Sequence, residues 1–280
     1  MPSEKVAEIH ERYRLIGGRS PILERTRAQA ERLQQALDAR TDGPRFHCAV
    51  GMRHWTPRIA TALVEMEHAG ISRAVGLVMA PHYSRMSVGA YFTKVDEAGT
   101  SVTVAPVERW HLMPELLAGL ASRVADGLSA FADGIRDHVA IVFTAHSLPE
   151  RILEWDDPYP DELRATADAV AQRLAANGIH NAHEFAYQSA AMTPDPWLGP
   201  DAGEALEQLH GAGVPGALLV PIGFTSDHVE ILYDIDVEYQ RLAARLGCAL
   251  RRIDMVNDDP VVMSGLSRVV CEAAGERGWM

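Results

Sequence analysis

The chain has 280 residues, of which 47% are apolar, so it can bury the core of one large α/β domain or of two ordinary domains. Two domains is our first prediction. The formal charge is −12 and no block of lysine or arginine occurs, so we expect no binding to nucleic acid. No window is long and apolar enough for a membrane span, and the polar N-terminus carries no signal-peptide pattern. We therefore expect a soluble cytoplasmic protein without membrane insertion, and a monomer.

The first segment differs in charge from the remainder. Residues 1–40 hold seven arginines and one lysine against six acids, whereas the rest of the chain is strongly acidic. If the ligand is an anion, its acid groups should lie near this segment.

The chain opens with two predicted helices and a strand. Apolar residues recur at steps of three and four over 3–16 and again over 21–40, with Gly17 and Gly18 ending the first run. The segment 46–52 then has the pattern of a strand. Thr56 and Pro57 are typical of a cap and a first helical turn, followed by a helical stripe that Gly70 ends.

The remaining strands are short and continuously apolar. We predict them at 74–80, 102–107, 139–144, 184–188 and 217–222, separated by stretches compatible with helices. Strands that are apolar throughout are buried on both faces, which is typical of a parallel sheet covered by helices. The predicted class is α/β and doubly wound, with a boundary near residue 115.

Three predicted strands deliver a histidine at or just beyond their carboxyl ends. His82, His146 and His228 hold these positions, and ligands of open parallel sheets bind at this edge. A single such histidine would more often be a packed polar residue than a functional one. Three of them predict a lined cleft.

An acidic ladder follows the last of these histidines. Asp227, Glu230, Asp234 and Glu238 are spaced by three, four and four residues, so a helix would place them on one face. Like charges at this spacing cost a helix about 0.2–0.5 kcal/mol per pair. A solvated acidic face and a cation-binding face both fit the spacing, and both interpretations stay open at this point.

One apparent motif has the wrong context. Gly211, Gly213 and Gly216 match GxGxxG, but they follow a helix pattern and precede a strand, which is the reverse of a dinucleotide site. We expect a helix stop and a turn there. The sequence contains neither a phosphate-binding loop nor a nucleophile elbow.

Longer motifs carry a resemblance to a known family. The chain resembles the ferrochelatases, the class II chelatases that insert ferrous iron into a porphyrin, over nearly its whole length. The segments that carry it are RYRLIGGRSP (12–21), GMRHWTP (51–57), MAPHYSRMSVGAY (79–91), TAHSLPERI (144–152), DPYPDEL (157–163), YQSAAMTPDPWLGP (187–200) and GFTSDHVEILYDIDVEY (223–239).

The resemblance implies a fold and residue roles. The fold is two Rossmann-like domains, here 1–115 and 116–256, with a cleft between them and a last helix within 257–280 that returns to the first domain. By similarity His146 is a ferrous ligand and acceptor of pyrrole protons, and Glu230 is its acidic partner across the ring, with a tetrapyrrole-sized gap between the two. The metal or proton path would run along Asp234 and Glu238, and the porphyrin contacts would be Arg12, Tyr13, Ser20 and His111.

The resemblance also suggests what the protein binds. Iron and porphyrin are substrates, no prosthetic group is needed, and three scattered cysteines do not match the four that hold an iron–sulfur cluster in some relatives. The acidic, anchor-free chain resembles the soluble bacterial form that acts on coproporphyrin III more than the membrane-associated form that acts on protoporphyrin IX. Relatives begin with a further strand and loop that this chain lacks, so we expect the first domain to miss its first strand. That departure keeps two alternatives open, a noncatalytic porphyrin binder and a chelatase for another metal or tetrapyrrole.

Overall fold

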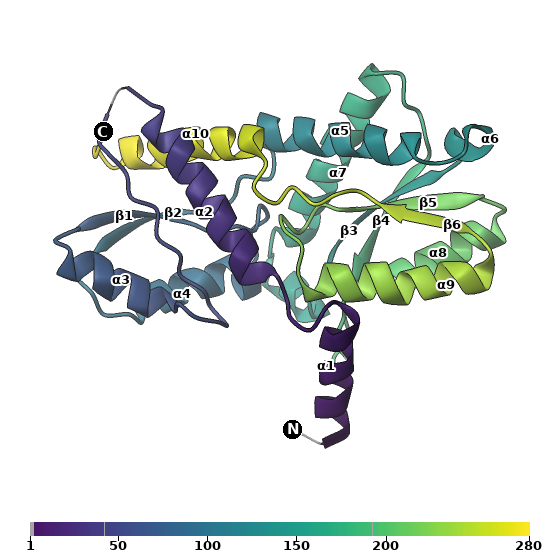
Figure 1. Cartoon of the computed structure of the whole chain (residues 1–280), viewed down its shortest axis with the longest axis horizontal. Helices are drawn as coiled ribbons and strands as arrows, with labels where there is room; N and C mark the ends of the chain where they lie inside the picture. Colours follow the sequence, from purple (N-terminus) through teal and green to yellow (C-terminus); the bar gives the residue numbers. More distant parts are fainter. Residues whose placement is uncertain (1–2, 42, 192) are drawn as a thin grey trace.

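Two parallel sheets form the centre of the molecule. The computed structural model describes residues 3–41, 43–191 and 193–280. In the described residues, the smaller sheet pairs β1 (Arg73–Leu77) with β2 (Thr103–Val107). The larger sheet has the order β4-β3-β5-β6, with bounds β3 Ala140–His146, β4 His183–Gln188, β5 Gly216–Pro221 and β6 Ala249–Arg252. The two sheets lie side by side along the long axis (Figure 1).

Helices lie on both sides of the two sheets. In Figure 1, α10 and α5 run along one side and α3, α4, α8 and α9 along the other. This arrangement confirms the predicted α/β class with parallel sheets flanked by helices. The helix bounds are α1 Ser3–Leu15, α2 Ile22–Asp38, α3 Ile59–His68, α4 Ala90–Asp96, α5 Pro114–Ser129, α6 Asp133–Arg136, α7 Tyr159–Ala176, α8 Ala202–Gly211, α9 Gln240–Leu246 and α10 Pro260–Glu276. Two π-helices, η1 (Arg85–Gly89) and η3 (Glu230–Tyr239), and the 3₁₀-helix η2 (Glu150–Trp155) complete the elements.

The strand β3 carries His146 and is buried along most of its length. It lies between β4 and β5, and every residue from Ala140 to Ala145 is buried, whereas His146 at its end is partly exposed. A central strand covered by helices on both faces has no solvent side, which explains its continuous apolar run. The buried core therefore fixes the backbone that delivers His146.

The predicted strand at 46–52 is wrong, because this segment is extended but pairs with no described strand. The side chain of Gln34 on α2 instead provides hydrogen bonds of the kind that a neighbouring strand would provide. Its Nε2 donates to the carbonyl of Phe46 at 3.0 Å, and its Oε1 accepts from the amide of Cys48 at 2.7 Å. A carboxamide can satisfy one donor and one acceptor of an extended chain, and sequence periodicity carries no sign of it.

Helix α3 begins later than the sequence predicted. Thr56 is not its cap and Pro57 is not in its first turn, since the helix starts at Ile59 after an extended Arg58. The carbonyl of Pro57 accepts from the amide of Met52 at 2.8 Å, which ties both ends of the preceding turn together.

The prediction of a helix stop and a turn at Gly211–Gly216 is confirmed, because α8 ends at Gly211 and Gly213 has a positive φ of 80° before β5. Strand β6 was not predicted.

The last helix packs against the first part of the chain. Helix α10 contacts α2, β1 and β2, and it also contacts α5. Its first turn is capped by Asp259, whose carboxylate accepts from the amides of Val261 and Val262 and pairs with Arg123 at 2.9 Å. The ion pair thereby joins α5 to the start of α10.

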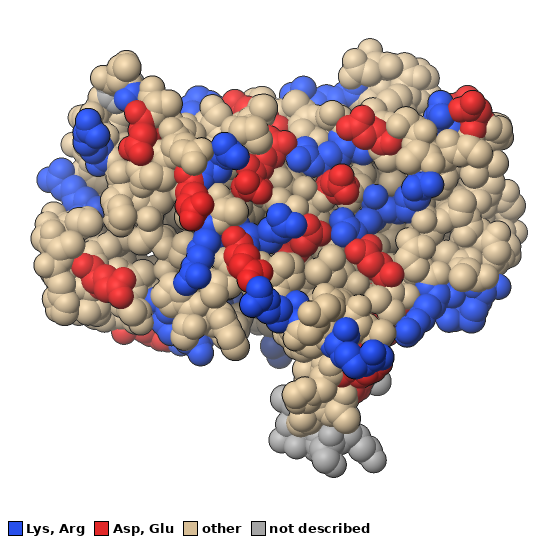
Figure 2. Space-filling view, viewed as in Figure 1, with Lys and Arg blue, Asp and Glu red and all other residues tan. Residues whose placement is uncertain are grey.

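The surface carries charges of both signs. Figure 2 shows acidic and basic side chains interspersed over the face that α2 and α10 occupy, without a large patch of one sign. Within the described parts of the chain, we find no helix with the length and apolar character that a membrane crossing requires.

Candidate active site

His146 stands at the carboxyl edge of the larger sheet. It is the last residue of β3 and lies beside Gln188, the last residue of β4. The hydroxyl of Tyr159 donates to its carbonyl at 3.0 Å, and the rings of Trp197 and Phe224 flank its imidazole at 6.5 and 6.3 Å. The side chain is 29% exposed, so the imidazole is held by packing and still reachable.

Glu230 is the first residue of η3 and contacts two histidines. Its Oε1 lies 3.5 Å from Nε2 of His146, and its Oε2 lies 3.1 Å from Nε2 of His228. The chain brings them together because β5, which leads into the loop that carries His228, is the neighbour of β3 in the sheet. The sequence identified His228 as a strand-end histidine but gave it no role in the site.

The contact corrects one expectation. We expected His146 and Glu230 to face each other across a gap wide enough for a tetrapyrrole, whereas their side chains touch. Two groups in contact cannot lie on opposite faces of a macrocycle. If a porphyrin binds here, both groups meet it from the same side.

The hydrogen-bond partners of His146 explain its electrostatics. Its Nδ1 contacts the carbonyl of Ser147 and its Nε2 faces Glu230, and both partners can only accept. Burial alone would lower the pKa of His146, but the hydrogen bonds and the charge of Glu230 favour the imidazolium, and the net result is a raised pKa. The pKa of Glu230 is correspondingly held well below its ordinary value by the two histidines, against the opposing effect of burial.

The site is not a preformed metal cage. Within the described residues, no three His, Cys, Asp or Glu side chains are arranged so that they could hold a metal ion together. The reason is visible in the contacts, since His146 and His228 both direct Nε2 at the carboxylate of Glu230. A metal ion entering here has to replace at least one of these contacts.

Three of the four acids of the predicted ladder lie on one helix. Asp234 and Glu238 share η3 with Glu230, and the wider turn of a π-helix still keeps residues four apart on one side. Asp234 is buried and accepts a hydrogen bond from Ser189, while Glu238 is exposed. Burial, together with the charges of Glu230 and Glu238, raises the pKa of Asp234 to about 6, against the opposing hydrogen bond from Ser189.

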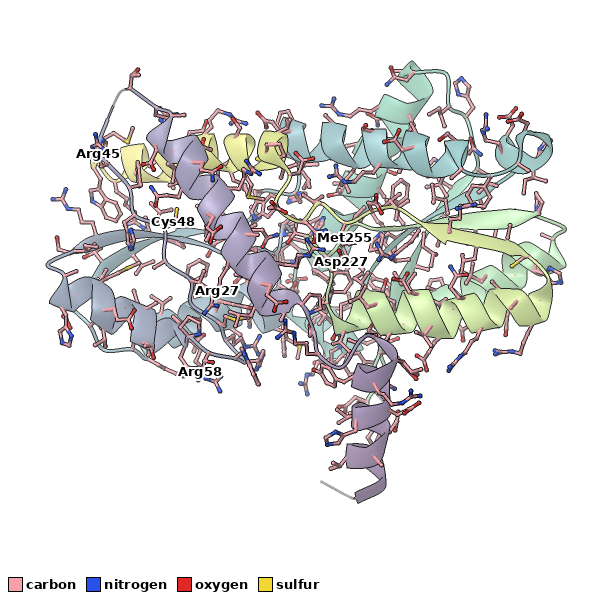
Figure 3. All side chains as sticks on the ribbon, viewed as in Figure 1. Arg27, Arg45, Cys48, Arg58, Asp227 and Met255 are labelled. Atoms are coloured by element: carbon pink, nitrogen blue, oxygen red, sulfur yellow. The ribbon has the colours of Figure 1, made fainter. Side chains whose placement is uncertain are left out.

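Asp227 does not belong to this ladder. It precedes η3 and pairs with Arg252 at 3.2 Å and with Arg25 of α2 at 3.6 Å. Asn257 also donates to its carboxylate at 2.9 Å. Figure 3 places Asp227 beside the lower part of α2, between the two halves of the molecule. Asp227 therefore joins α2 to the loop that carries His228.

The predicted porphyrin contacts are scattered. Arg12 joins the acidic row, with Nη1 at 4.0 Å from Asp234 and its guanidinium 4.9 Å from the ring centre of Tyr233. Tyr13 is half-buried near the end of α1, and the hydroxyl of Ser20 accepts from the amide of Ile22 at 3.4 Å. Neither of these placements brings Tyr13 or Ser20 to the histidine and glutamate group.

His82 and His111 form a separate buried pair. Their rings stack at 5.3 Å, Nε2 of His82 lies 2.8 Å from the hydroxyl of Thr166, and Nδ1 of His111 lies 3.4 Å from Glu162. Burial lowers the pKa of His82 to about 3 and that of His111 to about 4. The expectation that three strand-end histidines line one cleft is therefore wrong, since only His146 and His228 meet.

Comparison with known proteins decides the family. The sequence profile described as Ferrochelatase matches residues 1–274. The chain belongs to the ferrochelatase family. Proteins named ferrochelatase from Herpetosiphon aurantiacus and Deinococcus radiodurans are 39% and 41% identical to it, over 96% of this chain and 88% and 85% of theirs. A coproporphyrin III ferrochelatase from Geobacillus kaustophilus is 35% identical over 99% of this chain and 88% of its own.

Solved structures agree on the fold of this ferrochelatase-family chain. SirB from Bacillus subtilis with Fe³⁺ superposes with a TM-score of 0.57 at 15% identity, covering 89% of this chain and 90% of its own. A multi-domain protein from Deinococcus radiodurans, described as similar in structure to chelatases, gives a TM-score of 0.52 at 14% identity, covering 88% and 51%. At these identities the likeness shows the chelatase fold alone.

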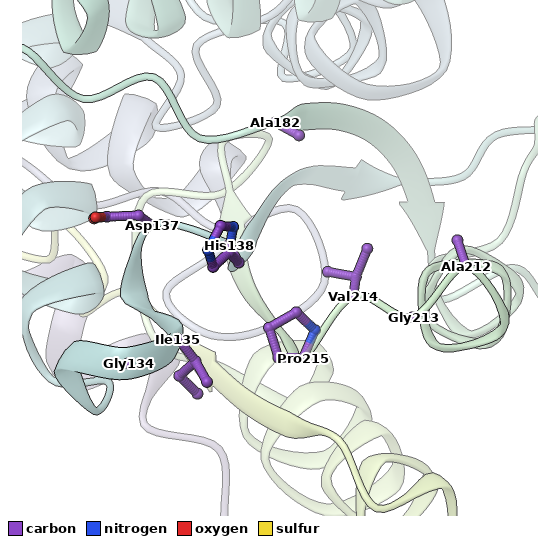
Figure 4. Close-up of a pocket in the computed structure, with 9 residues that line it drawn as sticks. All are labelled: Gly134, Ile135, Asp137, His138, Ala182, Ala212, Gly213, Val214 and Pro215. Atoms are coloured by element: carbon purple, nitrogen blue, oxygen red, sulfur yellow. The ribbon is translucent and has the colours of Figure 1, made fainter.

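A hollow lies at the edge of the larger sheet opposite to His146. It has a volume of about 540 Å³, and its lining residues precede β3, β4 and β5 rather than follow them. Figure 4 shows His138 among small and apolar neighbours there. Ligands of parallel sheets bind at the carboxyl edge, so in this ferrochelatase-family fold the histidine and glutamate group is the better candidate site.

Proposed function

We propose that the chain is a ferrochelatase that inserts Fe²⁺ into coproporphyrin III, using His146 as the base and Glu230 as its partner. The observation that carries the proposal is the contact of one carboxylate with two imidazoles at the carboxyl edge of the sheet. Family membership supports metal insertion. The coproporphyrin preference has its support in relatives of that name at about 35% identity.

The reaction releases two protons, and the site offers a route for them. Insertion exchanges two pyrrole N–H bonds for bonds to iron, so a base must take each proton as the metal loses its water. His146 accepts at Nε2 once it has lost its own proton to solvent, and an approaching dication favours that loss because its charge repels the imidazolium. Because both groups meet the macrocycle from one side, proton removal occurs on that face.

The acidic row can carry the protons outward. Asp234, with a pKa of about 6, changes charge near neutral pH and lies one helical step from Glu230. Glu238 is exposed one step further on. Protons therefore pass from a buried carboxylate to a solvated one. Arg12 beside Asp234 limits the build-up of negative charge along the row.

The test is an anaerobic insertion assay. Purified protein is mixed with Fe²⁺, or with Zn²⁺ as a redox-inert substitute, and metalloporphyrin absorbance is followed with coproporphyrin III and protoporphyrin IX in parallel. We expect turnover that is faster with coproporphyrin III. His146→Ala should lower kcat by roughly a hundredfold or more, a size typical of general-base loss. The exposed His180→Ala is the matched control and should have no effect.

Two results contradict the proposal. Porphyrin binding without turnover would indicate a noncatalytic binder. Equal turnover of His146→Ala and the unsubstituted protein would exclude the mechanism, and faster turnover of protoporphyrin IX would exclude the substrate assignment.

A further inference from the structure

Gln188 is a buried residue that lies beside the two groups of the site. It is the residue of β4 that aligns with His146 on β3, and it is 0% exposed. Its main-chain carbonyl accepts from the amide of Ser147 at 2.8 Å. The main chain of Gln188 therefore fixes the backbone of Ser147, the residue that follows His146.

The side chain of Gln188 joins three elements. Its Oε1 accepts from the hydroxyl of Thr144, which is also 0% exposed, at 2.7 Å. Its Nε2 donates to the main-chain carbonyl of Glu230 at 3.3 Å and approaches the hydroxyl of Ser189 at 3.4 Å. Thr144 lies two residues before His146 on β3, and Glu230 opens η3. One side chain thus spans from the strand that carries the imidazole to the helix that carries the carboxylate.

The chemistry of the contacts requires an amide. A main-chain carbonyl can only accept, so the group facing Glu230 has to donate. Thr144 donates toward Oε1, so the other end of the side chain has to accept. Glutamine provides both ends at the right length, whereas glutamate would bring a negative oxygen against a carbonyl. An apolar residue would leave a buried hydroxyl and a buried carbonyl without this partner, which is costly.

We propose that Gln188 is a positioning residue that sets the separation of His146 and Glu230. It touches no reacting atom, and it acts by fixing the start of η3 relative to the end of β3. This inference rests on the proposed function, because the separation matters only if the two groups act together. Near-angstrom displacements of paired catalytic groups lower rates by up to about a hundredfold, so the effect should be large.

Two substitutions and a matched control test the proposal. Gln188→Met keeps the length and removes both polar contacts, and Thr144→Val keeps the shape and removes one. Gln240→Met is the control, since Gln240 also donates to a main-chain carbonyl, that of Leu250 at 3.3 Å, at the far end of η3. We expect Gln188→Met to lower kcat roughly ten- to hundredfold with KM for coproporphyrin III within about twofold. Thr144→Val should lower it less, and the double variant should be no slower than Gln188→Met alone, because both remove one connection.

A measurement without substrate separates this proposal from the proposed function. The ring ¹⁵N signals of His146, recorded in the ligand-free protein, should shift in Gln188→Met and Thr144→Val and stay unchanged in Gln240→Met. Absence of turnover in the unsubstituted protein would contradict the proposed function. The ¹⁵N signals of His146 would still show whether Gln188 positions this residue. Unchanged His146 signals in both variants, or a loss of kcat that Gln240→Met reproduces, overturns the positioning role.

Discussion

Nε2 of His146 lies 3.5 Å from Oε1 of Glu230, and the other oxygen of the same carboxylate faces His228 at 3.1 Å. The carboxylate therefore contacts two imidazoles that lie at or after the ends of different strands. This arrangement couples the charge of His146 to that of Glu230. Under the proposed function, it would place proton acceptance on one face of the macrocycle.

Replacing Glu230 should change the titration of His146. In Glu230→Gln the charge that favours the imidazolium is lost while burial remains, so the pKa of His146 should fall from its raised value. NMR titration of the His146 ring measures this directly. Glu272→Gln, on the exposed part of α10, is the control and should leave the curve unchanged. An unaltered His146 pKa in Glu230→Gln would show that the carboxylate does not govern it.

Asp234 should destabilise the fold as the pH rises. Its pKa is raised from 3.8 to about 6, so the folded protein binds this proton more tightly than the unfolded chain does. The resulting stabilisation is complete below the unfolded pKa and is lost as pH rises through the folded pKa. We expect Asp234→Asn to be more stable than the unsubstituted protein at pH 8 by about 1–3 kcal/mol, with the difference vanishing near pH 4. Urea unfolding at both pH values tests this, and a gain at pH 4 alone would have the wrong sign.

Gln34 should stabilise the segment that lacks a strand partner. Gln34→Leu leaves the carbonyl of Phe46 and the amide of Cys48 without this partner, so the free energy of unfolding should fall by about 1–3 kcal/mol. Gln35→Leu is the matched control on the same helix, because Gln35 is exposed and its side chain accepts a hydrogen bond from Arg32, which is exposed as well. Thermal or urea unfolding compares the two, and an equal loss in both would contradict the role of Gln34.

Asp157 should hold the two halves of the chain together. It is 9% exposed, and its carboxylate accepts from the amide of Arg85 at 2.8 Å, the hydroxyl of Ser84 at 3.1 Å and the amide of Tyr159 at 3.1 Å. Asp157→Ala should cost about 1–3 kcal/mol, since buried donors lose a charged acceptor.

The control for Asp157 is Asp161→Ala, whose carboxylate in the first turn of α7 is 89% exposed. Limited proteolysis should cut Asp157→Ala faster than this control near residues 82–85. Identical unfolding curves for both variants would contradict the proposed connection.

Local pattern was sufficient for most of the fold. The continuous apolar runs predicted β1 to β5 because a strand buried on both faces must be apolar along its whole length. Periodicity predicted α1 and α2 to within two residues of their ends. It failed at 46–52, where the partner is a side chain, and at β6, whose sequence ALRR has no apolar run.

The residues of the site could be predicted from the sequence, but the contacts among them could not. Strand ends and spacing identified His146, His228, Glu230 and Asp234 as candidates, because residue type and position along an element are local properties. Which of these side chains touch depends on the strand order. Because β5 lies beside β3, the segment after β5 that carries His228 and Glu230 lies next to His146. His82 instead contacts the hydroxyl of Thr166 on α7. Contacts between residues distant in sequence are set by packing of the whole chain, and only the tertiary structure could decide them.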